Sequence, residues 1–291
     1  MSESQAALEV SVLENQWALL VRRLVQHKTA MIGLVIITAM VLVALLAPAI
    51  ASHDPLKQDI SNRFARPSRD HYFGTDALGR DLYSRVVFGA RLSLMLGVVA
   101  VGIAFSVGVL TGLLAGYYPR VDMVIMRLVD ILMAFPAILL AIAIVGVLGP
   151  GVFNAIIAIG ITSIPGFIRI TRASVLSLRQ TEYVEAARAT GAADIRILYR
   201  HIFPNIMAPI IVFGTLHLSS AILSGAILSF LGLGAQPPTP EWGAMVSSSR
   251  QYLHLAPHMA LFPILAIFLT VLGFNFLGDG LRDVLDPRLK N

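Results

Sequence analysis

The sequence has no cysteine, little charge and only three lysines among its 291 residues. Without cysteine the chain cannot form a disulfide bond, a thiolate metal site or a cysteine nucleophile. Charged residues make up 13% of the sequence, against roughly 25% in soluble domains. Hydrophobic residues make up 56%, and the mean hydropathy is +0.77. This composition leaves too little polar surface for a soluble globule and indicates a membrane protein.

Several enzymatic motifs are also missing. The lysines follow His27, Leu56 and Leu289, so no Gly-Lys-Ser/Thr occurs and the chain lacks a P-loop for ATP. Neither His-Glu-x-x-His nor Gly-x-Ser-x-Gly is present, which leaves an intramembrane enzyme without support. We therefore expect no catalytic residue, no bound cofactor and no metal site on this chain. If ATP drives the protein, a separate polypeptide must hydrolyse it.

Six apolar runs can cross a membrane as helices. About 30 Å of hydrocarbon requires roughly 20 helical residues. Lipid offers no hydrogen-bond partners, and the runs lack the period-2 alternation of barrel strands, so helices are expected. The predicted fold class is an all-α polytopic membrane protein with six transmembrane helices. The predicted spans are 29–51, 92–116, 123–148, 152–168, 207–233 and 259–278.

The first run has a second interpretation. Ala49-Ile50-Ala51 resembles the small-residue cleavage site of a secretory signal. The apolar stretch of 29–51 is longer than the usual range of about 7 to 15 residues in such signals. An uncleaved membrane helix is therefore favoured.

The distribution of lysine and arginine predicts the orientation. Six spans place both termini on one side, and that side carries fourteen of the 22 basic residues. Cytoplasmic termini are therefore expected in a multi-pass protein of the plasma membrane. The 52–91 segment, expected outside, carries seven of the other eight basic residues and five aspartates, which indicate a folded, internally paired segment. The expected cytoplasmic parts are 1–28, the 117–127 turn, the 169–205 loop and 279–291, and the second outer loop is 234–258.

Small residues recur in and just before the second run at steps of three or four. Such steps lie along one helix face and allow two helix backbones to approach closely. We expect this seam to pack inside the helix bundle. Its members are Gly89, Ser93, Gly97, Ala100, Ala104, Gly108, Gly112 and Gly116.

The polar 169–205 loop is predicted to contain two short helices. Ser177 with Gln180 indicates a capping box that opens the first helix, and Gly191 is placed to end it. Asp194 would begin the second helix, and Pro204 would stop it. An apolar stripe is expected on the second helix at Ile195, Leu198, Tyr199 and Ile202.

The same loop carries a specific resemblance. Glu185-Ala186-Ala187, Gly191 and His201-Ile202-Phe203-Pro204, at these spacings, resemble the EAA loop of binding-protein-dependent ABC importer permeases. The resemblance implies a type I ABC importer permease fold with a permease core at 92–278. It also implies that this loop docks in a cleft of a cytoplasmic ATPase. The implied coupling residues are Glu185, Ala186, Ala187, Gly191 and Pro204.

Other stretches resemble the second permease subunit of dipeptide, oligopeptide and nickel importers. They are Phe73 to Asp81, Gly89 to Ser93, Gln236 to Gly243, Gly278 to Asp283, and Asp286-Pro287-Arg288. The resemblance implies import of di- or oligopeptides, with nickel complexes or glutathione-like peptides as alternatives. The implied partners are a homologous permease subunit, one or two ABC ATPase subunits that bind ATP and magnesium, an extracytoplasmic substrate-binding protein and the lipid bilayer. No nucleic acid partner is expected.

The outer segments also have local interpretations. Asp76, Arg80, Asp81 and Arg85 are expected to pair at i+4 spacing on a helix, and the spacing lacks the alternating carboxylates of a calcium loop. An exposed Trp242 would serve as an interface or membrane-surface anchor. In the resembling family an aromatic residue often stands at the position of His258, so His258 would affect docking of an outside partner.

A secondary carrier driven by ions is the competing hypothesis, since such a carrier needs ionisable groups within the membrane. Asp130 is one candidate, with Arg127 as its expected partner. His217, with Ser220 and Ser224 on the same helix face, is the candidate for lining a transport path. A carrier would leave the polar 169–205 loop without a role, so an ATP-driven importer is favoured.

Overall fold

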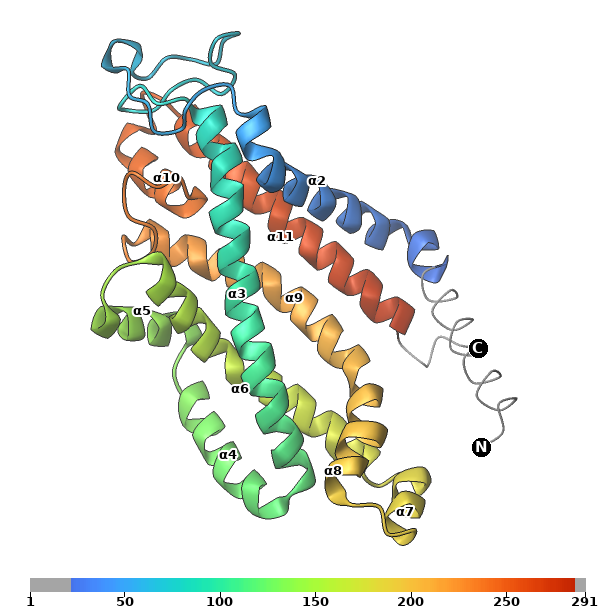
Figure 1. Cartoon of the computed structure of the whole chain (residues 1–291). Helices are drawn as coiled ribbons and strands as arrows, with labels where there is room; N and C mark the ends of the chain where they lie inside the picture. The colour runs from blue at the N-terminus through green and yellow to red at the C-terminus, as the bar shows by residue number, and fades with distance from the viewer. Residues whose placement is uncertain (1–21, 286–291) are drawn as a thin grey trace.

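The computed structural model describes residues 22–285, and these contain helices but no β-strand (Figure 1). This confirms the all-α prediction. The Asp286-Pro287-Arg288 stretch and most of the predicted 1–28 segment lie outside the described residues. Five long helices form the bundle: α2 (Lys28–Ile50), α3 (Leu82–Tyr117), α6 (Val152–Leu178), α9 (Phe203–Phe230) and α11 (His258–Leu285). The shorter elements are η1 (Ile60–Asn62), α4 (Pro119–Met133), α5 (Ala137–Leu148), α7 (Glu182–Ala189), α8 (Asp194–Arg196), η2 (Ile197–Ile202), α10 (Trp242–Ser249) and η3 (Arg250–Tyr252).

Four of the five long helices are longer than the apolar runs predicted, and α2 has the predicted length. All five are long and apolar enough to cross a membrane. The second helix begins at Leu82 rather than at residue 92, because Asp81 caps it by accepting a hydrogen bond from the Ser84 backbone N–H. The run predicted at 152–168 is short, but α6 continues to Leu178 and keeps Pro165 inside the helix.

The third predicted span, 123–148, is not one helix. It divides into α4 and α5, which meet at an angle of 89°. The break falls at Phe135-Pro136, where proline lacks a backbone N–H and disfavours helical geometry in the preceding residue.

The broken pair nevertheless returns the chain across the bundle. Arg179, just after α6, donates to the Gly116 carbonyl near the end of α3 (3.2 Å). At the other end of α6, the Gly151 N–H donates to the Leu233 carbonyl just after α9 (3.0 Å). The α4–α5 pair must therefore connect opposite ends of the bundle, as a sixth crossing would.

The predicted seam of small residues is confirmed, and all eight are buried on α3. A Cβ built on Gly108 would lie 2.4 Å from the Phe167 Cβ, and one on Gly112 would lie 2.7 Å from the Thr171 Cβ. The seam therefore brings α3 against α6 at backbone distance. The aromatic ring of Phe167 fills the centre of the core that α3, α6 and α9 share.

A second core joins α2, α11, α10 and the first half of α3. Trp242 is buried in it, with 1% of its surface exposed, and its indole N–H donates to the Val86 carbonyl (2.9 Å). Gly89 leaves the space for the ring, since a Cβ there would lie 2.9 Å from the Trp242 Cδ1. The prediction of an exposed anchor at Trp242 is therefore wrong. His258 is also buried, beside Gly74, and its effect on the docking of an outside partner stays a prediction.

The 52–81 segment folds over one end of the bundle, the end opposite α7 (Figure 1). Asp76 and Arg80 pair as predicted (2.7 Å), but they lie in a turn rather than a helix, because the helix begins only at Leu82. Arg85 also pairs with Asp76 (3.7 Å). Gly74 and Gly79, with φ of +80° and +72°, permit tight turns in this segment.

Candidate functional site

The loop between α6 and α9 begins with the short helix α7, which ends in a hydrogen-bonded turn. The Ala192 N–H donates to the Ala187 carbonyl (3.1 Å), and the Gly191 N–H donates to the Arg188 carbonyl (3.0 Å). These two bonds form a Schellman motif, which requires a left-handed residue just after the helix. Gly191 supplies it with φ of +84°, so the predicted role of this glycine as the helix terminator is confirmed.

Two helix boundaries predicted in this loop are wrong. Ser177 does not open a helix, because α6 continues to Leu178 and the new helix begins at Glu182. Pro204 does not end one either. It stands in the first turn of α9, directly after η2, and the chain is helical from Asp194 to Phe230.

The predicted apolar stripe divides between two faces. Leu198 and Ile202 are buried together with Ile197, whereas Ile195 and Tyr199 are 72% and 75% exposed. The cause is η2, whose six residues form a π-helical segment. A π-helix bonds i to i+5 instead of i to i+4, so the faces rotate away from the pattern expected of an α-helix.

Contacts with the end of α3 position α7 and α8. The Tyr117 hydroxyl donates to the Asp194 carboxylate (2.7 Å), and the Arg188 guanidinium lies over the Tyr117 ring (5.8 Å). Arg179 bonds the end of α3 directly. This pairing was not predictable from local sequence patterns, because Tyr117 precedes Asp194 by 77 residues.

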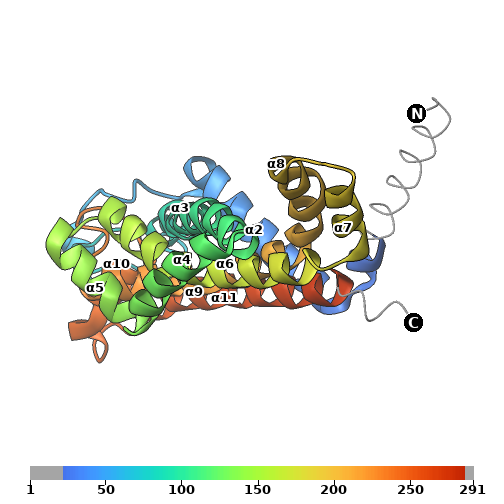
Figure 2. The same cartoon turned by 90° about the horizontal axis from the view of Figure 1, so that it is seen from below.

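The outward face of this loop carries exposed apolar side chains. Val184 is fully buried beneath α7, while Glu185 and Ala186 are exposed and Ala187 is half-buried. Tyr183, Ile195 and Tyr199 are also exposed. We call Tyr183, Glu185, Ala186, Ile195 and Tyr199 the loop face. Exposed aromatic and apolar side chains beside charged ones are typical of a protein-binding surface. Seen from below, α7 and α8 lie together at one side, far from α5 (Figure 2).

The three predicted path residues also come together. His217, Ser220 and Ser224 line one cavity of about 120 Å³, with α5 and α6 forming its other walls. The His217 ring stacks on Phe213 (5.4 Å between centroids). Its Nε2 atom is buried without a hydrogen-bond partner among the described residues. The cavity is therefore lined by a histidine and by the hydroxyl side chains of Thr162, Ser163, Ser220 and Ser224.

The carrier hypothesis loses its other candidate. Asp130 pairs with Arg169 of α6 (2.8 Å), not with Arg127 as predicted. Both side chains are about half exposed or more, so the pair lies at the bundle surface. Nearby, Arg172 makes a second ion pair with Asp122 of α4 (2.6 Å). Asp130 therefore tethers α4 to α6 and does not line the cavity.

Comparisons with known proteins agree with this architecture. Residues 108–291 match the family described as binding-protein-dependent transport system inner membrane component. Residues 15–67 match the N-terminal TM domain of oligopeptide transport permease C. A solved structure of the MetNI methionine ABC transporter in an inward-facing conformation has the same fold, with a TM-score of 0.57 and 20% identity over 69% of this chain and 97% of that one.

Curated relatives are much more similar in sequence. The dipeptide transport system permease protein DppC of Alkalihalophilus pseudofirmus is 52% identical, over 94% of this chain and 91% of the relative. The glutathione transport system permease protein GsiD of Shigella dysenteriae is 51% identical, over 92% and 89%. The chain therefore belongs to the binding-protein-dependent inner membrane components, the permease subunits of ABC importers, which are not themselves enzymes.

Proposed function

We propose that this chain imports short peptides across the cytoplasmic membrane, powered by ATP hydrolysis on a separate subunit that docks on the loop face. The proposal rests on one observation, a continuous helical connection between the loop face and the cavity beside His217. The loop face lies on α7, α8 and η2, and α8 and η2 continue without a break into α9. That helix carries His217, Ser220 and Ser224 of the cavity.

The proposed complex contains a homologous permease subunit, one or two ATPase subunits and an extracytoplasmic binding protein. ATP and magnesium bind to the ATPases. Both termini and the loop face lie in the cytoplasm, in keeping with the excess of basic residues on that side. Closure of the ATPases moves the segment Glu185 to Pro204 as one unit and tilts the bundle from inward-facing to outward-facing.

The proposed cargo is a di- or oligopeptide. Relatives named for dipeptide and for glutathione transport are equally similar to this chain, at 52% and 51% identity, and glutathione is itself a short peptide. The ligand found in the co-purified binding protein tests this assignment. A nickel complex there would overturn the peptide cargo and leave the importer mechanism in place. Uptake by this chain alone, driven by an ion gradient, would overturn the mechanism.

The coupling role of Gly191 is tested by Gly191→Val. The left-handed conformation costs a β-carbon residue about 1–2 kcal/mol, a factor of roughly 5–30 in a local equilibrium. A Cβ at this position meets no atom within 4 Å, so the variant strains the turn without a steric clash. We expect ATP-driven uptake to fall by about tenfold, with normal amounts of the protein in the membrane fraction.

Gly232→Val is the matched control. Gly232 also has a positive φ (+80°) and open space around it, and it ends α9 in a Schellman motif of its own, but it lies at the other end of the bundle. Uptake in this variant should stay within about twofold of the wild type. The backbone strain is similar to that in Gly191→Val, but the loop face is unchanged. Equal uptake in the two variants, whether high or low, would contradict the coupling role.

A further inference from the structure

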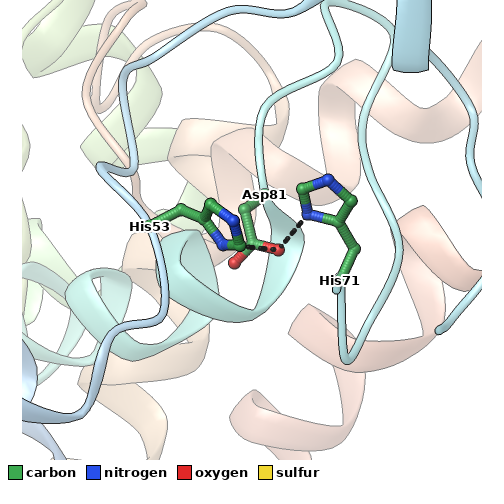
Figure 3. A group of neighbouring side chains, drawn as sticks. All are labelled: His53, His71 and Asp81. Atoms are coloured by element: carbon green, nitrogen blue, oxygen red, sulfur yellow. Dashed lines mark hydrogen bonds and ion pairs between the residues drawn. The ribbon is translucent and has the colours of Figure 1, made fainter. Parts of the chain in front are cut away.

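Two histidines and one aspartate that the transport mechanism does not use meet in the 52–81 segment (Figure 3). His53 lies three residues after α2, His71 lies in the loop, and Asp81 caps α3. One nitrogen or oxygen atom from each residue lies within 4.8 Å of the other two. Three separate parts of the chain therefore present metal-ligating atoms to one point.

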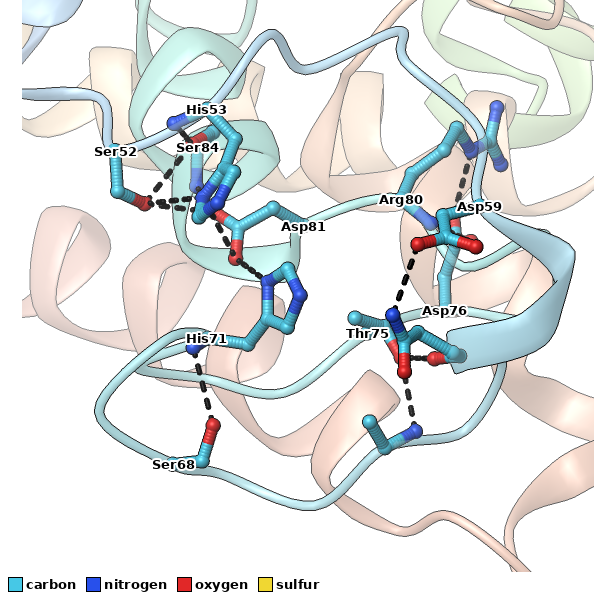
Figure 4. Close-up of polar contacts among 12 residues, drawn as sticks. Ser52, His53, Asp59, Ser68, His71, Thr75, Asp76, Arg80, Asp81 and Ser84 are labelled. Atoms are coloured by element: carbon cyan, nitrogen blue, oxygen red, sulfur yellow. Dashed lines mark hydrogen bonds and ion pairs between the residues drawn. The ribbon is translucent and has the colours of Figure 1, made fainter.

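The two oxygens of Asp81 have different partners (Figure 4). Oδ2 accepts hydrogen bonds from the Ser84 backbone N–H (2.8 Å) and the Ser52 hydroxyl (3.2 Å). Oδ1 faces the histidines, at 2.9 Å from His71 Nδ1 and 3.8 Å from His53 Nδ1. Hydrogen bonds to the outer oxygen of a carboxylate fix the direction of the inner one, which is how protein metal ligands are usually supported.

The Asp81 carboxylate also lacks a permanent positive partner among the described residues. Its side chain is 1% exposed, and a buried charge is normally paired or bound to metal. The neighbouring arginines, Arg80 and Arg85, both pair with Asp76 instead.

We propose that His53, His71 and Asp81 bind one divalent transition-metal ion of the zinc type, with water completing its shell. Two imidazole nitrogens and one carboxylate oxygen suit Zn²⁺ or Co²⁺, whereas Ca²⁺ and Mg²⁺ require six or more oxygens. This proposal departs from the expectation of no metal site, which rested on missing motifs and on carboxylate spacing for calcium and did not consider a site built on histidines.

The geometry needs only a small adjustment. Ligand atoms about 2.0–2.1 Å from a tetrahedral ion lie about 3.4 Å apart, closer than the widest separation of 4.8 Å. His53 is the ligand free to move, because its side chain is 40% exposed. Its exposure also gives the ion a route from solvent. Once bound, the ion ties the end of α2 and the loop to the start of α3.

Cobalt binding to the purified full chain in detergent tests the proposal. The chain has no cysteine, so visible absorption of Co²⁺ arises without any thiolate ligand. We expect one Co²⁺ per chain, displaced by Zn²⁺, and a melting temperature that rises with added Zn²⁺. His53→Gln and His71→Gln should each weaken binding by at least about tenfold. The control His254→Gln, an exposed histidine outside the site, should bind like the wild type.

Two results would overturn the site. One is equal Co²⁺ binding and an equal Zn²⁺-dependent rise in melting temperature in the wild type and the His53→Gln/His71→Gln double variant. The other comes from X-ray absorption at the zinc edge of the wild type, which needs no variant. Two imidazoles with oxygen ligands are expected, and a different number of imidazoles would contradict the assignment.

Discussion

At the scale of single residues, the Tyr117 hydroxyl joins the membrane-spanning bundle to the loop that we propose as the dock. It donates to Asp194, which lies in the first turn of α8. A hydrogen bond to a charged group contributes about 1.5–3 kcal/mol, and less where the acceptor is exposed, as Asp194 is. This one oxygen atom therefore contributes directly to holding α8 against α3.

Tyr117→Phe removes that oxygen and keeps the ring under Arg188. We expect α8 to open more often, by a factor of about five, because about 1 kcal/mol of stabilisation is lost. Hydrogen exchange of the α8 amides measures this opening. Tyr72→Phe at the opposite end, where Tyr72 is exposed, is the control. Unchanged exchange in Tyr117→Phe would mean that packing alone positions α8.

Residue roles were predictable only where they depend on local geometry. Gly191 was found because ending a helix requires a residue tolerant of positive φ, and the sequence around it supplies that pattern. Trp242 was misplaced because its burial depends on Val86, 156 residues away, and on the space left by Gly89. His53 and His71 were passed over because nothing in their spacing indicates that Asp81 lies between them.

At the scale of helices, the close approach of α3 and α6 explains why small residues recur in the second half of α3, at Gly108, Gly112 and Gly116. Gly112→Ala would place a Cβ 2.7 Å from the Thr171 Cβ and 2.9 Å from the Ile168 carbonyl oxygen. Overpacking of this kind costs about 1–3 kcal/mol. We expect the variant to have a lower melting temperature in detergent than the wild type.

Gly102→Ala is the comparison for this prediction. It makes the same change on the same helix, but no atom lies within 4 Å of the added Cβ. The melting temperature should stay unchanged or rise slightly, because alanine has the higher helix propensity. A Gly112→Ala variant that is as stable as Gly102→Ala would contradict the seam as a packing constraint.

The helices themselves were predictable from apolar length, since lipid leaves the backbone no alternative. The positions at which the helices break were harder to predict. Pro136 divides the third span, and a proline is a local signal that the sequence shows directly. The span was predicted from the length of the apolar run, and that criterion does not take proline into account. The π-helical segment η2 has no comparable signal, because the register shift depends on how Ile197 and Ile202 pack in the core.

At the scale of the whole molecule, the orientation in the membrane remains our prediction. The chain has no native cysteine, so single introduced cysteines report accessibility without background. Lys57 and Ala189 are both exposed and lie in the 52–81 segment and in α7. A membrane-impermeant maleimide should label Lys57→Cys in intact cells, and Ala189→Cys only after permeabilisation. The reverse pattern would place the loop face outside and leave it unable to meet an ATPase.

The helical run from Asp194 to Phe230 also has a mechanical consequence. At 1.5 Å per residue, about 33 Å separates Ile195 from His217. Over that length, a rotation of about 5° moves the far end by about 3 Å, roughly the width of a water molecule. The run thus acts as a lever arm. A small rotation of the loop face is sufficient to change the shape of the cavity beside His217.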